Sequence, residues 1–78
     1  MKTIIFVWDD CVNCESAKAT IKQKNIDIEQ IHIDPTKREG RDIQMQYRVM
    51  WVPTILVIHW GKEDERYVWQ WVLDFLNK

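Results

Sequence analysis

The sequence lacks several features that would point away from a small globular domain. No stretch approaches the roughly 18 consecutive apolar residues of a membrane-spanning helix. The apolar start, up to Trp8, runs straight into Asp9 and Asp10, so it is too short for the apolar segment of a secretory signal peptide. Eleven basic against twelve acidic residues leave a net charge of -1, which gives no general attraction to nucleic acid or membranes. We therefore expect a cytoplasmic protein that binds neither.

Repeats, low-complexity segments and linkers are also missing, and the chain has only two glycines and two prolines. We therefore expect one domain over residues 1–78, near the lower end of the size that folds alone. Five tryptophans are many for this length. They can strengthen a small core or form a flat binding face.

The chain has two cysteines, Cys11 and Cys14, three positions apart. A disulfide between them closes a loop too short to constrain much of the chain. In a reducing cytosol a structural disulfide is not expected at all. The pair is therefore interpreted as reactive.

The apolar pattern predicts an α/β fold with the order β-α-β-α-β-β-α. Strands are expected over 4–8, 29–33, 55–58 and 66–68, and the first and last helices over 11–24 and 70–77. Between them, a turn and cap signal at Asp34-Pro35-Thr36 opens a polar helix that runs to about Tyr47. Asn25 ends the first helix, Gly40 weakens the second, and Trp60-Gly61 forms a hairpin turn. A parallel βαβ unit and an antiparallel hairpin then give a four-stranded mixed sheet flanked by three helices.

The dithiol lies at the predicted junction of the first strand and the first helix, which is typical of redox-active pairs. The N–H groups and the dipole of a helix N-terminus favour a negative sulfur at Cys11, and such sites lower the pKa of a thiol. Cys14 lies one turn deeper on the same face. We therefore expect Cys11 to attack a substrate disulfide and Cys14 to resolve the mixed disulfide.

A structural zinc site is the alternative for a Cys-x-x-Cys pair, and it needs about four ligands. Only His32 and His59 remain as partners, and neither belongs to a second paired motif. We expect both to be half-buried strand residues, and no metal.

Carboxylates surround the dithiol at Asp9, Asp10 and Glu15, with Lys18 one turn further along. They oppose the helix dipole and would destabilise the thiolate, which makes the pair a better reductant. Alternatively they are solvated and screened, with little effect.

Three motifs together resemble the thioredoxin superfamily over nearly the whole chain. They are Cys11-Val12-Asn13-Cys14 after the first strand, Asp34-Pro35 at the second helix, and Val52-Pro53-Thr54 before the third strand. The resemblance implies a thioredoxin-like fold in which Pro53 is cis and packs against the dithiol. It also implies that Val52 lines a groove whose backbone pairs with an extended substrate.

Within this superfamily the chain is similar to the short redoxins of ribonucleotide reductase systems and to phage-type glutaredoxins and thioredoxins. It differs from thioredoxins at Ile5, where they carry a buried aspartate, so that Asp9 or Asp10 would have to serve as proton acceptor for Cys14. Glutaredoxins have Gly-Gly after the last strand, where Trp69 stands here and would crowd glutathione.

Trp51 and Trp69 are expected near the groove, where they either clasp an apolar substrate segment or shield the core. The resemblance implies a monomeric thiol–disulfide oxidoreductase that reduces protein disulfides without a bound cofactor. Its electron donor would be a flavoenzyme of the thioredoxin-reductase kind or a small thiol. A glutathione-dependent glutaredoxin and a non-catalytic peptide-binding module are the alternatives.

Overall fold

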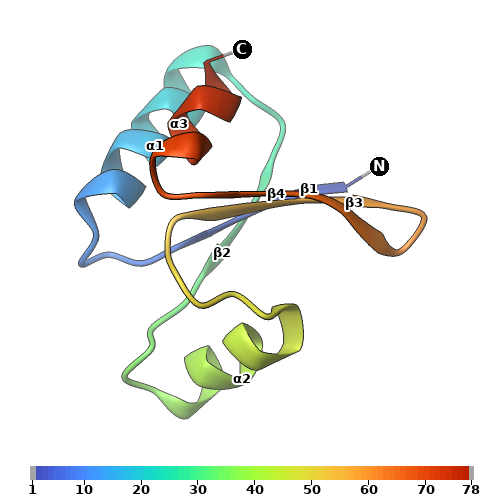
Figure 1. Cartoon of the computed structure of the whole chain (residues 1–78). Helices are drawn as coiled ribbons and strands as arrows, with labels where there is room; N and C mark the ends of the chain where they lie inside the picture. The colour runs from blue at the N-terminus through green and yellow to red at the C-terminus, as the bar shows by residue number, and fades with distance from the viewer. Residues whose placement is uncertain (1, 78) are drawn as a thin grey trace.

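The computed structural model describes residues 2–77. Its elements are β1 (Lys2–Val7), α1 (Val12–Lys24), β2 (Glu29–His32), α2 (Arg38–Tyr47), β3 (Thr54–His59), β4 (Lys62–Val68) and α3 (Gln70–Leu76). One sheet lies between the α1/α3 pair and α2 (Figure 1). Within this part of the chain, every helix is too short or too polar to traverse a bilayer.

The sheet has four strands in the order β2-β1-β3-β4. β1 pairs in parallel with β2 and antiparallel with β3, and β3 pairs antiparallel with β4. This is the mixed sheet that the sequence predicts.

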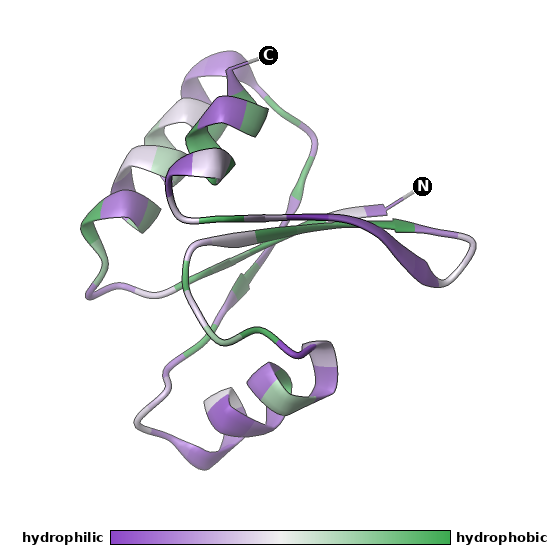
Figure 2. Cartoon of the chain, in the orientation of Figure 1, coloured by the Kyte–Doolittle hydropathy of each residue, from purple (hydrophilic) through white to green (hydrophobic). Residues whose placement is uncertain are grey.

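β1 is buried on both faces because its alternate side chains enter two separate cores. Ile5 and Val7 pack with residues of α1 and α3, whereas Ile4 and Phe6 pack toward α2. The central strands are largely hydrophobic, and most of α2 is hydrophilic (Figure 2). The sheet is therefore held from both sides, and its ends carry the connecting loops.

The first helix ends as predicted. Asn25 adopts a left-handed conformation with φ 53°, and its N–H donates to the carbonyls of Ile21 and Lys22. Asparagine tolerates this conformation better than most residues, so it terminates the helix at little cost.

The turn predicted at Asp34-Pro35-Thr36 is confirmed, and the second helix begins after it at Arg38, with Lys37 as its N-cap. The Asp34 carboxylate accepts hydrogen bonds from the Thr36 N–H (2.9 Å) and hydroxyl (2.6 Å), which closes this turn. Gly40 was expected only to weaken this helix. It is in fact buried against the Asp34 backbone, which a Cβ at this position would overlap. Glycine is therefore required by packing here.

The hairpin turn at Trp60-Gly61 is confirmed, but the prediction for the last strand is too short. β4 begins at Lys62, and its charged first half is exposed because β4 is an edge strand that pairs only with β3. Charged residues are common on edge strands, where they oppose aggregation. Sequence alternation does not reveal such a strand.

Helix α3 buries Val72 and Leu76, with Phe75 half-buried, while Trp71 remains exposed. It packs against the core on the same side of the sheet as α1. The helix predicted over 70–77 is confirmed.

Candidate active site

The two cysteines form a disulfide at the start of α1, with their Cα atoms 5.2 Å apart. Cys11 is the N-cap residue of the helix, and Cys14 lies in its first turn. The predicted pairing and its place at the strand-to-helix junction are thus present in the structure (Figure 1).

The sulfur of Cys11 is surrounded by backbone groups. The N–H of Cys14 donates a hydrogen bond to it over 3.1 Å, and the carbonyl oxygen of Val52 lies 3.8 Å away. An N–H donor and the positive end of the helix dipole both stabilise negative charge on this sulfur when the pair is reduced.

The two cysteines differ in their access to solvent. Cys14 has no exposed surface, whereas Cys11 is partly exposed. Cys14 packs with Ile5 and Val7 in the core under α1. A substrate can therefore reach only Cys11 directly.

The loop before β3 lies against the dithiol. The Val52–Pro53 peptide bond is cis, and Pro53 is buried. The carbonyl of Pro53 accepts a hydrogen bond of 3.1 Å from the N–H of Trp69. The hydroxyl of Thr54 donates to the carbonyl of Trp51. The bond from Trp69 joins the loop to the turn between β4 and α3, and the bond from Thr54 closes the loop on itself.

A pocket of about 290 Å³ opens beside Cys11. It is lined by Trp8, Asp10, Cys11, Ile33, Pro35, Gln44, Met50, Trp51, Val52 and Trp69. Of the residues predicted to form a substrate groove, Trp51, Val52 and Trp69 are brought together here. Pro53 and Cys14 lie beneath this surface and do not line it.

Trp51 and Trp69 form an edge-to-face pair, with ring centroids 5.5 Å apart and an interplanar angle of 88°. Both remain about half exposed, at 58% and 49%. The backbone of Trp69 has φ 54° and ψ -123°, a region that glycine favours and that other residues adopt at a cost of about 1–3 kcal/mol. The pair thus forms part of the wall of the pocket that contains Cys11.

Comparison with known proteins identifies the fold. Neither a protein-family model nor a curated protein matches the sequence. Among solved structures, thioredoxin 1 of Thermosipho africanus TCF52B is 28% identical. It superposes with a TM-score of 0.71 over 99% of this chain and 88% of its own. The chain has the thioredoxin fold. It belongs to the thioredoxin superfamily.

More distant structures agree on the fold of this superfamily member. Oxidised thioredoxin O2 of Arabidopsis thaliana is 16% identical, with a TM-score of 0.70 over 97% of this chain and 69% of its own. Reduced thioredoxin pre-protein of Schistosoma mansoni is 18% identical, with a TM-score of 0.69 over 96% and 71%. The thioredoxin fold and the Cys11–Cys14 pair together support a thiol–disulfide redox role.

The carboxylates around the dithiol of this thioredoxin-fold protein take different partners. Lys18 lies 3.0 Å from Glu15 and 3.9 Å from Asp9, which is also 3.7 Å from His32. Asp10 has no ion pair among residues 2–77. In this part of the chain no carboxylate hydrogen-bonds the sulfur of Cys14, which carries no proton in this disulfide. A role of Asp9 or Asp10 as proton acceptor for Cys14, directly or through water, stays a prediction.

Both histidines lie in strands as predicted, but the prediction that they are half-buried is wrong. His32 and His59 end β2 and β3, and both are exposed instead of half-buried. Strand ends are open to solvent, so the alternation seen in the sequence does not continue there. Within residues 2–77 no group of three histidine, cysteine, aspartate or glutamate side chains is placed to hold a metal ion.

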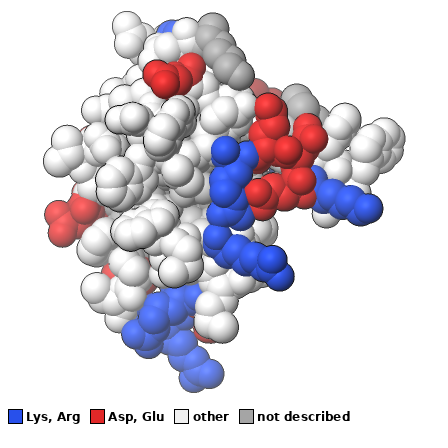
Figure 3. Space-filling view, viewed as in Figure 1, with Lys and Arg blue, Asp and Glu red and all other residues white. Residues whose placement is uncertain are grey.

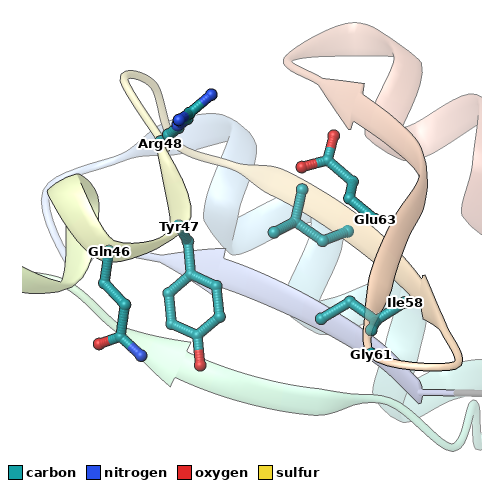
Figure 4. A pocket seen from close by; sticks show the side chains of 7 residues that line it. Gln46, Tyr47, Arg48, Ile58, Gly61 and Glu63 are labelled. Atoms are coloured by element: carbon teal, nitrogen blue, oxygen red, sulfur yellow. The ribbon is translucent and has the colours of Figure 1, made fainter.

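A second hollow, of about 330 Å³, lies at the other end of β3. Tyr47 and Arg48 from the end of α2 face Ile58 and Glu63 of the hairpin across it (Figure 4). It is slightly larger than the pocket beside Cys11, but it contains no cysteine or tryptophan. Its residues therefore offer no comparable redox chemistry.

Four residues that line the Cys11 pocket were not predicted from the sequence to do so: Ile33, Pro35, Gln44 and Met50. Met50, adjacent to Trp51, could have been included because it extends the same apolar loop. Gln44 could not, since the packing of α2 against the Asp34 turn decides which helix residues reach the pocket.

Proposed function

We propose that this protein reduces protein disulfides by dithiol exchange, with Cys11 as the attacking and Cys14 as the resolving cysteine. The observation that carries the proposal is the difference between the two sulfurs. Cys11 is partly exposed, caps α1 and accepts an N–H, whereas Cys14 is buried behind it. Attack requires an accessible thiolate, and resolution requires a second thiol within reach of the first.

The reaction starts from the reduced pair. The Cys11 thiolate attacks one sulfur of the substrate disulfide, which forms a mixed disulfide and releases the other substrate sulfur as a thiolate. Cys14 then gives up its proton, which the substrate thiolate released in the first step takes up through solvent, and attacks the Cys11 sulfur. This forms the Cys11–Cys14 disulfide and releases the second substrate sulfur as a thiolate, which solvent protonates. Two electrons pass to the substrate, and the protein is left in the oxidised state of this structure.

The electron donor that returns the pair to its reduced state would be a flavoenzyme of the thioredoxin-reductase kind or a small thiol. A reducing compartment such as the cytoplasm suits this cycle, because thiol systems there keep such pairs reduced. The choice of donor rests on the resemblance to the thioredoxin superfamily.

Two serine variants test the mechanism. Cys11→Ser should abolish disulfide reduction, because the attacking thiolate is gone. Cys14→Ser should stop after the first step and accumulate a mixed disulfide, detectable by mass spectrometry of the unreduced protein. Urea unfolding of each variant shows that it is folded, and Cys14→Ala replaces Cys14→Ser if the buried hydroxyl unfolds the chain. Normal turnover by the Cys14 variant would overturn the dithiol mechanism.

A further inference from the structure

The pocket beside Cys11 combines aromatic surface with negative charge. Three tryptophans, Trp8, Trp51 and Trp69, line it, and Asp10 is the one charged residue among its lining side chains. The Asp10 carboxylate takes part in none of the ion pairs among residues 2–77. Within this part of the chain, no basic side chain therefore competes with an incoming cation for this carboxylate.

Charge in the wider neighbourhood has the same sign. Asp9 and Glu15 flank the dithiol; among residues 2–77 Lys18 is the one ammonium group paired with them, and His32 also lies 3.7 Å from Asp9. In Figure 3, Lys and Arg side chains gather over α2, and on the hairpin side they lie mixed with Asp and Glu. The left side of that view, where the loops around the dithiol meet, is mostly uncharged, with carboxylate atoms at its edge. This surface attracts cations and repels anions.

From these two observations, and resting on the proposed function, we propose that the Cys11 pocket binds a cationic side chain next to the cysteine of a disulfide-bearing substrate. Indole faces attract ammonium and guanidinium groups, and the planar guanidinium of arginine also stacks on them. The aliphatic stem of such a side chain would pack on Met50 and the tryptophans while its head reaches Asp10. The favoured substrates are thus basic protein segments.

The same geometry disfavours glutathione. Glutathione carries two carboxylates and one ammonium group, so its net charge is negative, like that of the pocket rim, and the two repel each other. In addition, the N–H of Trp69, at the position where glutaredoxins have glycine, already donates to Pro53. It is unavailable to bind a glutathione carboxylate.

The test uses three oxidised peptides that differ only in the residue after the cysteine, which is arginine, leucine or glutamate. The reduced protein is mixed with each peptide and with glutathione disulfide, and the second-order rate of reduction is followed by tryptophan fluorescence. We expect the arginine peptide to react about tenfold faster than the leucine peptide, and the glutamate peptide and glutathione disulfide to be slowest. Added salt should narrow these differences.

Asp10→Asn should reduce the ratio of the arginine rate to the glutamate rate several-fold. Asp74→Asn, which removes an equal charge from the exposed face of α3, is the matched control and should leave the ratio unchanged. Equal rates for all peptides, a faster leucine peptide or a faster glutathione disulfide would each overturn this inference and leave the proposed function standing. Failure to reduce any disulfide would overturn the proposed function itself.

Discussion

Two tryptophans at the two ends of β4 share an unusual backbone. Trp60 precedes the strand with φ 58°, and Trp69 follows it with φ 54°. Positive φ is costly for any residue with a Cβ, and it is worst for bulky ones. Trp60 is 90% exposed and stacks on His59, whereas Trp69 packs on Trp51 in the wall of the Cys11 pocket.

The comparison shows that backbone strain alone does not identify a site. At the Trp60 end the turn is closed by a glycine, and the neighbouring hollow contains no reactive group. At the Trp69 end the strained residue contacts the surface through which a substrate reaches Cys11. Strain that coincides with reactive chemistry is the informative combination.

The largest predicted effect concerns α2, which contributes residues to the hollows at both ends of β4. α2 supplies Gln44 to the Cys11 pocket and Tyr47 to the other hollow. Helix propensity alone predicts that Gly40→Ala stabilises the protein by up to about 1 kcal/mol. Because the new methyl group would overlap the Asp34 backbone, we expect instead a loss of about 3 kcal/mol, measured by urea unfolding. A gain in the free energy of unfolding would contradict this and show that α2 can shift to make room for the methyl group. The control is Gln46→Ala, which places alanine at an exposed position of the same helix.

The second prediction concerns the Trp60 end alone. The Arg66 guanidinium donates to the carbonyls of Tyr47 and Arg48, at 2.9 and 2.7 Å, and to the Glu63 carboxylate. Arg66→Met should lower the free energy of unfolding by about 2 kcal/mol, because two helix-terminal carbonyls lose their partner. The rate of disulfide reduction should stay within twofold. A larger fall in rate at unchanged folding would mean that this end contributes to the reaction.

The third prediction applies one substitution to both ends. Trp60→Gly and Trp69→Gly each relieve a positive φ, and each should change the free energy of unfolding by about 1 kcal/mol or less, since lost packing and glycine entropy offset the gain. Their effects on peptide disulfide reduction should differ. Trp69→Gly should slow it about tenfold, whereas Trp60→Gly should leave it unchanged. Equal rates of peptide disulfide reduction for the two variants would contradict a functional difference between the Trp60 end and the Trp69 end of β4.

The smallest prediction is a pH effect at the Trp60 end. The hydrogen bond from Arg66 lowers the pKa of Glu63 below its ordinary value of 4.5. A carboxyl whose pKa is lower in the folded chain stabilises the fold above the unfolded pKa, and this contribution is lost as the pH falls through the folded pKa. Glu63→Gln should therefore cost about 0.5 kcal/mol or less at pH 7 and nothing near pH 2. If Glu63→Gln lowered the free energy of unfolding equally at pH 2 and pH 7, the loss would come from packing and not from the charge of Glu63.

Much of the fold could be predicted from the sequence because its strongest signals are local. The run in β1 reveals a strand buried on both faces, Asn25 marks a helix end, and Trp60-Gly61 marks a turn. The charged half of β4 and the packing of Gly40 could not be predicted. Both depend on which elements lie side by side, and this is decided by tertiary contacts.

The candidate site shows the same division. The spacing of Cys11 and Cys14 already indicates their roles, since three residues bring two side chains onto one helix face. The backbone of Trp69 and the contribution of Gln44 to the pocket are products of long-range packing. No local pattern in the sequence specifies either of them.

The central claim is that Cys11 and Cys14 form a reducing dithiol, and a redox titration tests it most directly. The protein is equilibrated in thiol/disulfide buffers, and the state of the pair is followed by tryptophan fluorescence, since Trp8 lies in the same pocket as Cys11. We predict a reversible two-electron transition near or below about −230 mV, in the range of cytosolic reductants. A potential near about −150 mV, or no reversible transition, would contradict a role in reducing disulfides.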